Sequence, residues 1–190
     1  MAEGVSLRSG CRVTHGAGAG VKQPFATIPL VMHELSAGGS GFCGQFGFIP
    51  FRDDFRLPRH VHLGDDETLV AERILVLNGV GLAELNGEIL VVAPGSLVDI
   101  APGVPHTWTA CPPGVRLPNG MVSDGSFLMI YEYAAPTGFF PIVETGTLSA
   151  AADYQPFTGD LEAIRFPVMT ASDVVARATL VWGLDERTLG

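Results

Sequence analysis

Basic residues are scarce in this sequence, and lysine is almost absent. The 190 residues include 11 Lys and Arg against 20 Asp and Glu, which gives a formal net charge of −9. A chain of this charge repels phosphate backbones and anionic lipid head groups, so we expect neither nucleic acid nor a membrane surface as its partner. Lys22 is the single lysine, and catalysis through a lysine imine therefore has almost no candidate.

Cysteines and long apolar runs are scarce too. Cys11, Cys43 and Cys111 are too few, and odd in number, for a disulfide framework. No apolar stretch reaches the roughly 20 residues that a membrane-spanning helix needs. No run of roughly 7 to 15 apolar residues follows Arg8 and Arg12, as it would in a secretory signal. We therefore expect a soluble protein of the reducing cytoplasm.

The sequence does have enough apolar residues for one domain with a sizeable core. Hydrophobic residues make up 47% of the chain and charged residues 16%, with a mean hydropathy of +0.32. We expect a flexible N-terminal arm over residues 1–22, because the glycines around 16–20 give the backbone much freedom. A β-barrel is expected over 23–148 and a C-terminal extension over 149–190.

The C-terminal extension contains the one helix that the sequence predicts. Thr170 or Ser172 provides an N-cap, the following residues through Trp182 continue the helix, and Gly183 ends it. We expect this short apolar helix to pack on the barrel.

Short runs of β-forming residues fill the middle of the chain. Asn78-Gly79 and Asn86-Gly87 separate three of them, and Asn-Gly is the strongest short-range hairpin signal because a type I′ turn needs two positive φ angles. The pattern predicts an antiparallel meander. Pro29 marks the first run as an edge strand, a candidate contact for a homodimer. The expected strands cover 25–34, 46–51, 72–77, 80–85, 88–92, 96–100, 127–133 and 137–147.

Three histidines stand out against this β pattern. His60 and His62 are one residue apart, so in an extended segment their side chains point to the same face. His106 follows a Pro-Gly turn after the strands, where a loop can direct it back toward the first pair. Three convergent imidazoles predict a metal site. His15 and His33 have no such patterned partners.

These residues resemble the two sequence motifs of the cupin superfamily. His60-Val61-His62 matches the His-x-His of the first motif, and Glu72 followed by six residues and then Gly79 matches its end; Gly95, Gly103 and His106 have the spacing of the second motif. The chain departs from the motifs at Asp54, Ala101 and Ala110, where the family has Gly, Pro and Asn. The resemblance implies an all-β double-stranded β-helix, or jelly-roll barrel, with a divalent metal held by three His and one Glu.

The spacing leaves two candidates for the carboxylate ligand. Nine residues separate His62 from Glu72, about five more than the motif has, so counting forward from His62 selects Glu67 and counting back from Gly79 selects Glu72. If Glu67 faced the metal in a regular strand, Arg73 would too, and an inward cation beside a dication is unfavourable. We prefer Glu72, with 63–71 as an inserted loop.

The expected ligand set is therefore His60, His62, Glu72 and His106. Imidazoles and one carboxylate suit one divalent transition metal, namely Fe, Mn, Ni, Co or Zn. The second nitrogen of each ring needs an acceptor, which Thr107, Thr109 or a backbone carbonyl could provide. Trp108 and Tyr131 are candidates to wall a small-molecule substrate pocket, although core packing explains them at least as well. Arg52, Arg56 and Arg59 could hold a substrate carboxylate or simply face solvent.

Three functions are compatible with this pattern. The first is a mononuclear non-haem oxygenase that acts on a small apolar or aromatic substrate, with Glu72 shifting between ligand and catalytic base. The second is a non-redox metal-dependent isomerase, cyclase or decarboxylase. The third is a cupin that binds a ligand without catalysis, and the fold alone does not choose among them.

Overall fold

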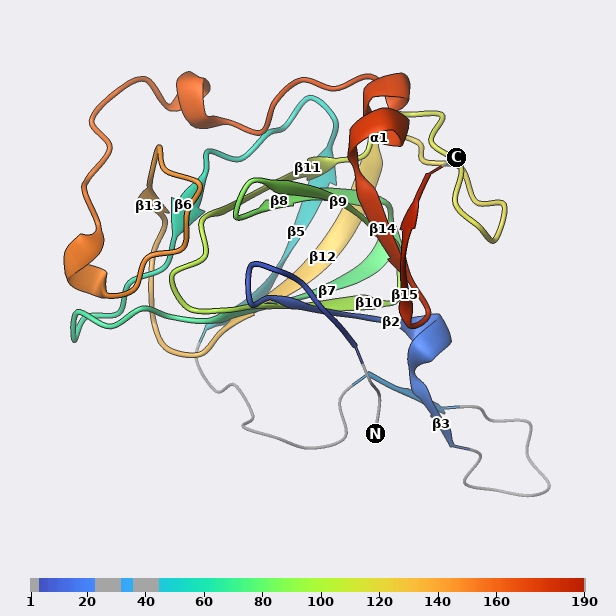
Figure 1. Cartoon of the computed structure of the whole chain (residues 1–190), viewed down its shortest axis with the longest axis horizontal. Coiled ribbons are helices and arrows are strands. Elements are labelled where there is room, and N and C mark those ends of the chain that lie inside the picture. Colours follow the sequence, from blue (N-terminus) through green and yellow to red (C-terminus); the bar gives the residue numbers. More distant parts are fainter. Residues whose placement is uncertain (1–3, 23–31, 36–44, 190) are drawn as a thin grey trace.

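The computed structural model describes residues 4–22, 32–35 and 45–189 (Figure 1). It contains one α-helix, α1 (Ala171–Arg177), and the 3₁₀ helices η1 (Gly16–Gly18), η2 (Ala151–Asp153) and η3 (Leu161–Ile164). The strands are β1 (Val5–Ser6), β2 (Arg12–His15), β3 (Gly20–Lys22), β4 (Met32–Glu34), β5 (Phe46–Arg52), β6 (His60–Val61), β7 (Glu72–Gly79), β8 (Gly81–Leu85), β9 (Glu88–Val92), β10 (Ser96–Ile100), β11 (His106–Ala110), β12 (Ser126–Tyr133), β13 (Phe140–Pro141), β14 (Thr179–Trp182) and β15 (Asp185–Thr188).

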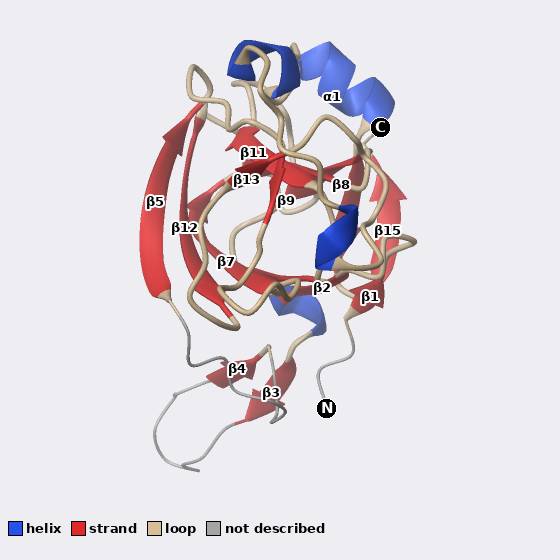
Figure 2. Cartoon of the chain, turned by 90° about the vertical axis from the view of Figure 1, so that its left-hand side faces the viewer, coloured by secondary structure: helices blue, strands red, loops and turns tan. Residues whose placement is uncertain are grey.

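Two sheets face each other across the main core. One has the strand order β1-β2-β10-β7-β12-β5 and the other β13-β6-β11-β8-β9-β14-β15, while β3 and β4 pair separately (Figures 1 and 2). From β7 to β13 the chain passes repeatedly from one sheet to the other, as in a double-stranded β-helix. The predicted all-β cupin fold class is confirmed.

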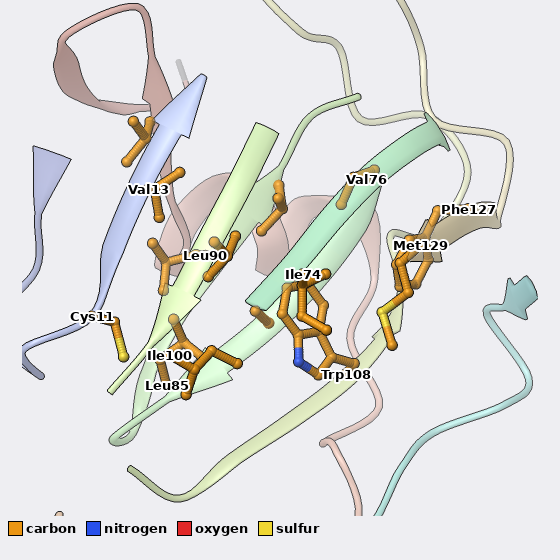
Figure 3. Packing of buried hydrophobic residues seen from close by; sticks show 14 of the residues in the cluster. Cys11, Val13, Ile74, Val76, Leu85, Leu90, Ile100, Trp108, Phe127 and Met129 are labelled. Carbon is orange, nitrogen blue, oxygen red and sulfur yellow. The ribbon is translucent and has the colours of Figure 1, made fainter. Parts of the chain in front are cut away.

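The core between the sheets follows from side-chain alternation along the strands. In β7, Ile74 and Val76 are fully buried, and they pack in one cluster with Trp108 of β11 and Phe127 of β12 (Figure 3). A second apolar cluster lies where β8 and β9 meet the C-terminal segment, and it includes Val174 of α1. Strand β8 is buried along its whole length because each of its faces contacts one of these clusters.

The predicted meander is wrong in one of its two Asn-Gly turns. Asn86 (φ 53°) and Gly87 (φ 81°) do join β8 to β9 as an antiparallel hairpin. Asn78-Gly79 instead ends β7, which pairs with β10 and β12, and the chain then crosses to β8 in the other sheet. Gly79 (φ 70°) lies near a bulge in β7 at Leu77, and a Cβ at Gly79 would come 2.7 Å from the Cα of Phe127.

The prediction of a flexible N-terminal arm is wrong for the segment that forms β2. This strand pairs with β10 over four residues, from Arg12 with Asp99 to His15 with Ser96. Cys11 and Val13 are buried in the main core. The glycines after His15 form a short 3₁₀ turn and not the start of a free tail, because the apolar residues that precede them are buried.

The C-terminal helix is shorter than predicted. Thr170 is its N-cap and forms a capping box with Asp173, as the sequence indicates, but the helix ends at Arg177. Residues 179–182 form β14, where Leu180 pairs in parallel with Val91 of β9 and is 1% exposed. The β-branched Thr179 and Val181 favour this strand, and burying Leu180 against β9 stabilises it over another helical turn.

Two other predicted strands have only a short strand within the described residues. Of the run 25–34, residues 25–31 lie outside the described part, and Met32–Glu34 forms β4, which pairs with β3. Of the run 137–147, only Phe140–Pro141 is a strand, and it pairs with β6. No helix in the described ranges is long and apolar enough to cross a membrane.

Candidate metal site

Three histidines meet between the two sheets. His60 begins β6, His62 follows that strand directly, and His106 begins β11, where it is the register partner of His60. Their ligand-capable nitrogens all lie within 4.8 Å of one another. The three rings are only 1–2% exposed. The structure thus brings together the three histidines that the sequence pattern singled out.

A glycine turn directs His106 into this cluster. Gly103 has a φ of 77°, and the turn is closed by a hydrogen bond from the Val104 N–H to the Ala101 carbonyl at 3.3 Å. A Cβ on Gly103 would come 2.5 Å from the Leu148 carbonyl oxygen. Both the positive φ and this close approach favour glycine, which explains the residue that the second cupin motif places here.

Each imidazole is oriented by a backbone carbonyl. Nδ1 of His60, His62 and His106 lies 2.8 Å from a carbonyl oxygen in every case, those of Pro58, Gly138 and Val104 respectively. A carbonyl only accepts, so Nδ1 carries the proton and the Nε2 lone pair of each neutral ring is directed elsewhere. Backbone carbonyls therefore provide the acceptors, while Thr107 and Thr109 donate to the carbonyls of Leu57 and Phe55.

Glu72 enters the cluster from the opposite sheet. It begins β7 and is 4% exposed. Its Oε2 atom lies 2.9 Å from Nε2 of His106 and 3.4 Å from Nε2 of His62. The neighbouring Arg73 faces the other side of the sheet, where it pairs with Asp99 at 2.8 Å. Strand alternation thus places the carboxylate inward and the guanidinium outward.

Glu67, the other candidate for the carboxylate ligand, lies apart from this cluster. It is exposed, with a φ of 56°, in a turn between the bridged residues Leu63 and Leu69. Residues 63–69 form a small hairpin of their own, which accounts for the extra length between His62 and Glu72.

Burial and mutual charge set the ionisation of the cluster. Burial lowers the pKa of His60 well below its ordinary range, and positive charge on His106 or His62 would lower it further, with partial compensation from Glu72. Burial raises the pKa of Glu72, but interactions with His106 and His62 outweigh this and hold it well below its ordinary range. The cluster therefore combines a neutral His60 with an ionised carboxylate.

The donor atoms of the cluster fit a metal cation. Nε2 of His62, Nε2 of His106 and Oε2 of Glu72 are buried without a hydrogen-bond partner among the described residues. With the proton on Nδ1, Nε2 is an acceptor that faces another acceptor at 2.9 Å, an arrangement that costs free energy unless a proton or a cation lies between them. A divalent transition metal bound by nitrogen and oxygen would satisfy all of these atoms.

Two aromatic residues that the sequence did not indicate lie against the histidines. The ring of Tyr133 is 4.4 Å from that of His62, and that of Phe139 is 4.5 Å from that of His60. Burial raises the pKa of Tyr133, and the charge of Glu72 adds to this, so the hydroxyl stays protonated. The loop between β12 and β13 carries Phe139 here, and no motif marks that loop.

The two predicted pocket residues pack in or against the main core. Trp108 is 1% exposed and packs in the main core, 6.2 Å from the ring of Phe127. Tyr131 is half-buried against that core and lies over Gly47, where the missing side chain makes room for its ring. Both residues contribute to packing.

The three arginines considered as substrate clamps have protein partners. Arg59 pairs with Glu84 at 2.7 Å and donates to the Val143 carbonyl. Arg56 donates to the Phe166 carbonyl and pairs with Glu162. Arg52 is exposed and lies 4.0 Å from Asp54. These guanidinium groups join segments of the fold.

Cys11, Cys111 and His15 are separate from the cluster. Cys11 and Cys111 are buried free thiols, and burial raises the pKa of both, that of Cys111 to about 12. His15 packs against Trp182 with ring centroids 4.2 Å apart. Cys43 lies outside the described residues, as does the side chain of His33.

Comparison with known proteins gives distant structural neighbours. No protein-family model matches the chain, and no curated protein matches it. A dTDP sugar isomerase from Desulfovibrio desulfuricans G20 is 16% identical, with a TM-score of 0.44 over 81% of this chain and 95% of that one. A dTDP-4-dehydrorhamnose 3,5-epimerase from Elizabethkingia anophelis NUHP1 is 12% identical, with a TM-score of 0.45 over 72% and 75%.

A third neighbour is a salicylate 1,2-dioxygenase from Pseudaminobacter salicylatoxidans. It is 14% identical, with a TM-score of 0.34 over 50% of this chain, and the chain spans about a quarter (24%) of its length. Likeness at this level concerns the fold and does not bear on the reaction. The strand order and the histidine cluster described above agree with the cupin-like fold that the two sequence motifs predict.

Proposed function

Taking the cupin fold as the premise, we propose that this protein is a mononuclear metal-dependent enzyme with His60, His62, Glu72 and His106 as ligands. The observation that carries the proposal is the set of buried acceptor atoms, Nε2 of two histidines and Oε2 of Glu72, that lack donors. Leaving such groups unsatisfied costs about 1–3 kcal/mol each, and a bound divalent cation removes that cost.

The reaction we propose is oxygenation of a small apolar or aromatic molecule. A divalent metal with four protein ligands supplies open positions for substrate and O₂. The protein holds the imidazoles in one tautomer through the Pro58, Gly138 and Val104 carbonyls. Glu72 would hold the metal and could accept a substrate proton, and Tyr133 is its register partner on β12. The aromatic surroundings support an apolar substrate.

The first test is metal content of protein purified without added metal. We expect about one equivalent of Fe, Mn, Ni, Co or Zn in the wild type, and its loss in His106→Ala and in Glu72→Gln. His15→Ala is the matched control, because His15 is also buried but lies outside the cluster. Retention of metal by His106→Ala, or absence of metal from the wild type after reconstitution, would refute the proposal.

The second test separates oxygenation from non-redox metal chemistry. A panel of small aromatic and apolar substrates is offered to the Fe(II)-loaded protein with and without O₂, and to the Zn(II)-loaded protein. An oxygenase consumes O₂ with product and is inactive with Zn(II). Turnover at the full rate under anaerobic conditions, or with Zn(II), would indicate an isomerase, cyclase or decarboxylase, and binding without turnover would indicate a non-catalytic ligand-binding cupin.

Two further expectations remain proposals. The small number of cysteines favours a cytoplasmic location, which fractionation of the source cells would test. A homodimer is proposed through the apolar run 25–32, most of which lies outside the described residues. Sedimentation of the wild type at micromolar concentration would decide between monomer and dimer.

A further inference from the structure

Phe139 is a large apolar side chain that is exposed directly beside the histidine cluster. Its ring centroid lies 4.5 Å from that of His60 and 5.6 Å from that of His62. It is nevertheless 51% exposed, whereas the two imidazoles that it contacts are 2% exposed. Part of the phenyl ring therefore covers the histidines, and the rest is available to a molecule that approaches the cluster.

Strand register explains this placement. In the β13–β6 pair, Pro141 is opposite His60 and Phe140 is opposite Val61. Extending the same register by one residue puts Phe139 opposite His62. Because successive side chains alternate between faces, Phe139 points to the side that His60 and His62 occupy, while Phe140 points away with Val61.

The backbone before Phe139 is fixed to the same site. The Gly138 carbonyl accepts the Nδ1 proton of His62 at 2.8 Å, and the Thr137 hydroxyl donates to the Leu63 carbonyl at 2.7 Å. Gly138 therefore orients the imidazole of His62, and the next residue, Phe139, packs its phenyl ring against the same imidazole. The ring of His62 also contacts Tyr133, so this imidazole lies between two aromatic side chains.

We infer that Phe139 determines substrate specificity: its exposed part packs against the planar apolar portion of a metal-coordinating substrate and selects aromatic over aliphatic molecules. The inference rests on the proposed metal-dependent function. An aromatic pair of this kind contributes about 0.5–1.5 kcal/mol beyond area burial, which corresponds to a preference of roughly fivefold.

The experiment uses two chelators that present the same donor atoms to a metal. Benzohydroxamate and acetohydroxamate differ in a phenyl against a methyl group, and calorimetry of Co(II)-reconstituted protein gives the affinity of each. We expect the wild type to favour benzohydroxamate, and Phe139→Ala to lower that preference about fivefold with acetohydroxamate affinity unchanged. Phe139→Leu keeps an apolar side chain without the ring and should lose most of the same preference.

Phe48→Ala is the matched control. Phe48 is 70% exposed on β5, where it is opposite Ile130, and among the described residues the aromatic side chains against His60 and His62 are Phe139 and Tyr133. This variant should retain the wild-type preference. An unchanged preference in both Phe139 variants, or an equal loss in Phe48→Ala, would overturn the inference. Co(II) content measured on the same samples separates the two hypotheses, because a wild type that holds no metal refutes the proposed function itself.

Discussion

Replacing Gly79 by alanine should destabilise the protein far more than the same change at Gly95. Both glycines have positive φ angles, 70° and 78°. Alanine in this left-handed backbone conformation costs about 1–2 kcal/mol of stability at either position. At Gly95 no other atom lies within 4 Å of the added Cβ, so this is the whole cost.

At Gly79 the added Cβ meets the backbone of β12. It would overlap the Ser126 carbonyl oxygen and come 2.7 Å from the Cα of Phe127. To avoid this, β7 must move from β12, which weakens the hydrogen bond from the Val80 N–H to the Ser126 carbonyl. A backbone shift of this kind costs about 1–3 kcal/mol, so the total for Gly79→Ala is about 2–5 kcal/mol.

Thermal and urea unfolding of the two variants measure this difference. For a chain of this size, 1 kcal/mol lowers the midpoint temperature by about 2–4 °C. We expect a decrease of about 10 °C for Gly79→Ala and of about 4 °C for Gly95→Ala. Equal decreases would refute the reasoning, because they would show that φ alone, and not the contact with β12, requires glycine at the end of β7.

The buried thiols and the Arg59–Glu84 pair give further expected outcomes. Burial holds Cys11 and Cys111 in the protonated form and raises the pKa of Cys111 to about 12. In a Cys43→Ala background, iodoacetamide at pH 8.5 should therefore label neither thiol until urea unfolds the protein. Rapid labelling of the native protein would contradict this expectation. Glu84→Ala leaves the Arg59 guanidinium, only 16% exposed, without its carboxylate and should cost about 3 kcal/mol in urea unfolding. The double variant Arg59→Met with Glu84→Leu should recover much of this loss, and a double variant less stable than Glu84→Ala would be the contrary result.

The histidine pattern could be interpreted from sequence because it depends on local geometry. His60 and His62 share a face in any extended segment, and Gly103 marks the turn that precedes His106. The choice of Glu72 over Glu67 also followed from alternation, since Arg73 must face away from Glu72. The structure puts Arg73 beside Asp99 on the outer face, as that argument requires.

The elements that were predicted wrongly depend on contacts between distant segments. Asn78-Gly79 has the composition of a hairpin turn, yet β7 is more stable between β10 and β12 than beside β8. Thr179–Trp182 continues a helical pattern, yet it becomes a strand because β9 offers it a partner. Glycine-rich sequence suggested an arm at the N-terminus, while the buried side chains of Cys11 and Val13 hold β2 in the sheet.

The sequence by itself determined the fold class, the three histidines and the carboxylate that lies among them, because strand alternation and turn chemistry act over a few residues. Only the tertiary structure decided which strands pair, which carbonyls orient the imidazoles and which aromatic rings surround them. Pro58, Gly138 and Val104 contribute through backbone carbonyls, which every residue type has. Phe139 reaches the site through a loop that joins the two sheets. No residue type or spacing marks such contacts, since they arise from the folding of segments far apart in the chain.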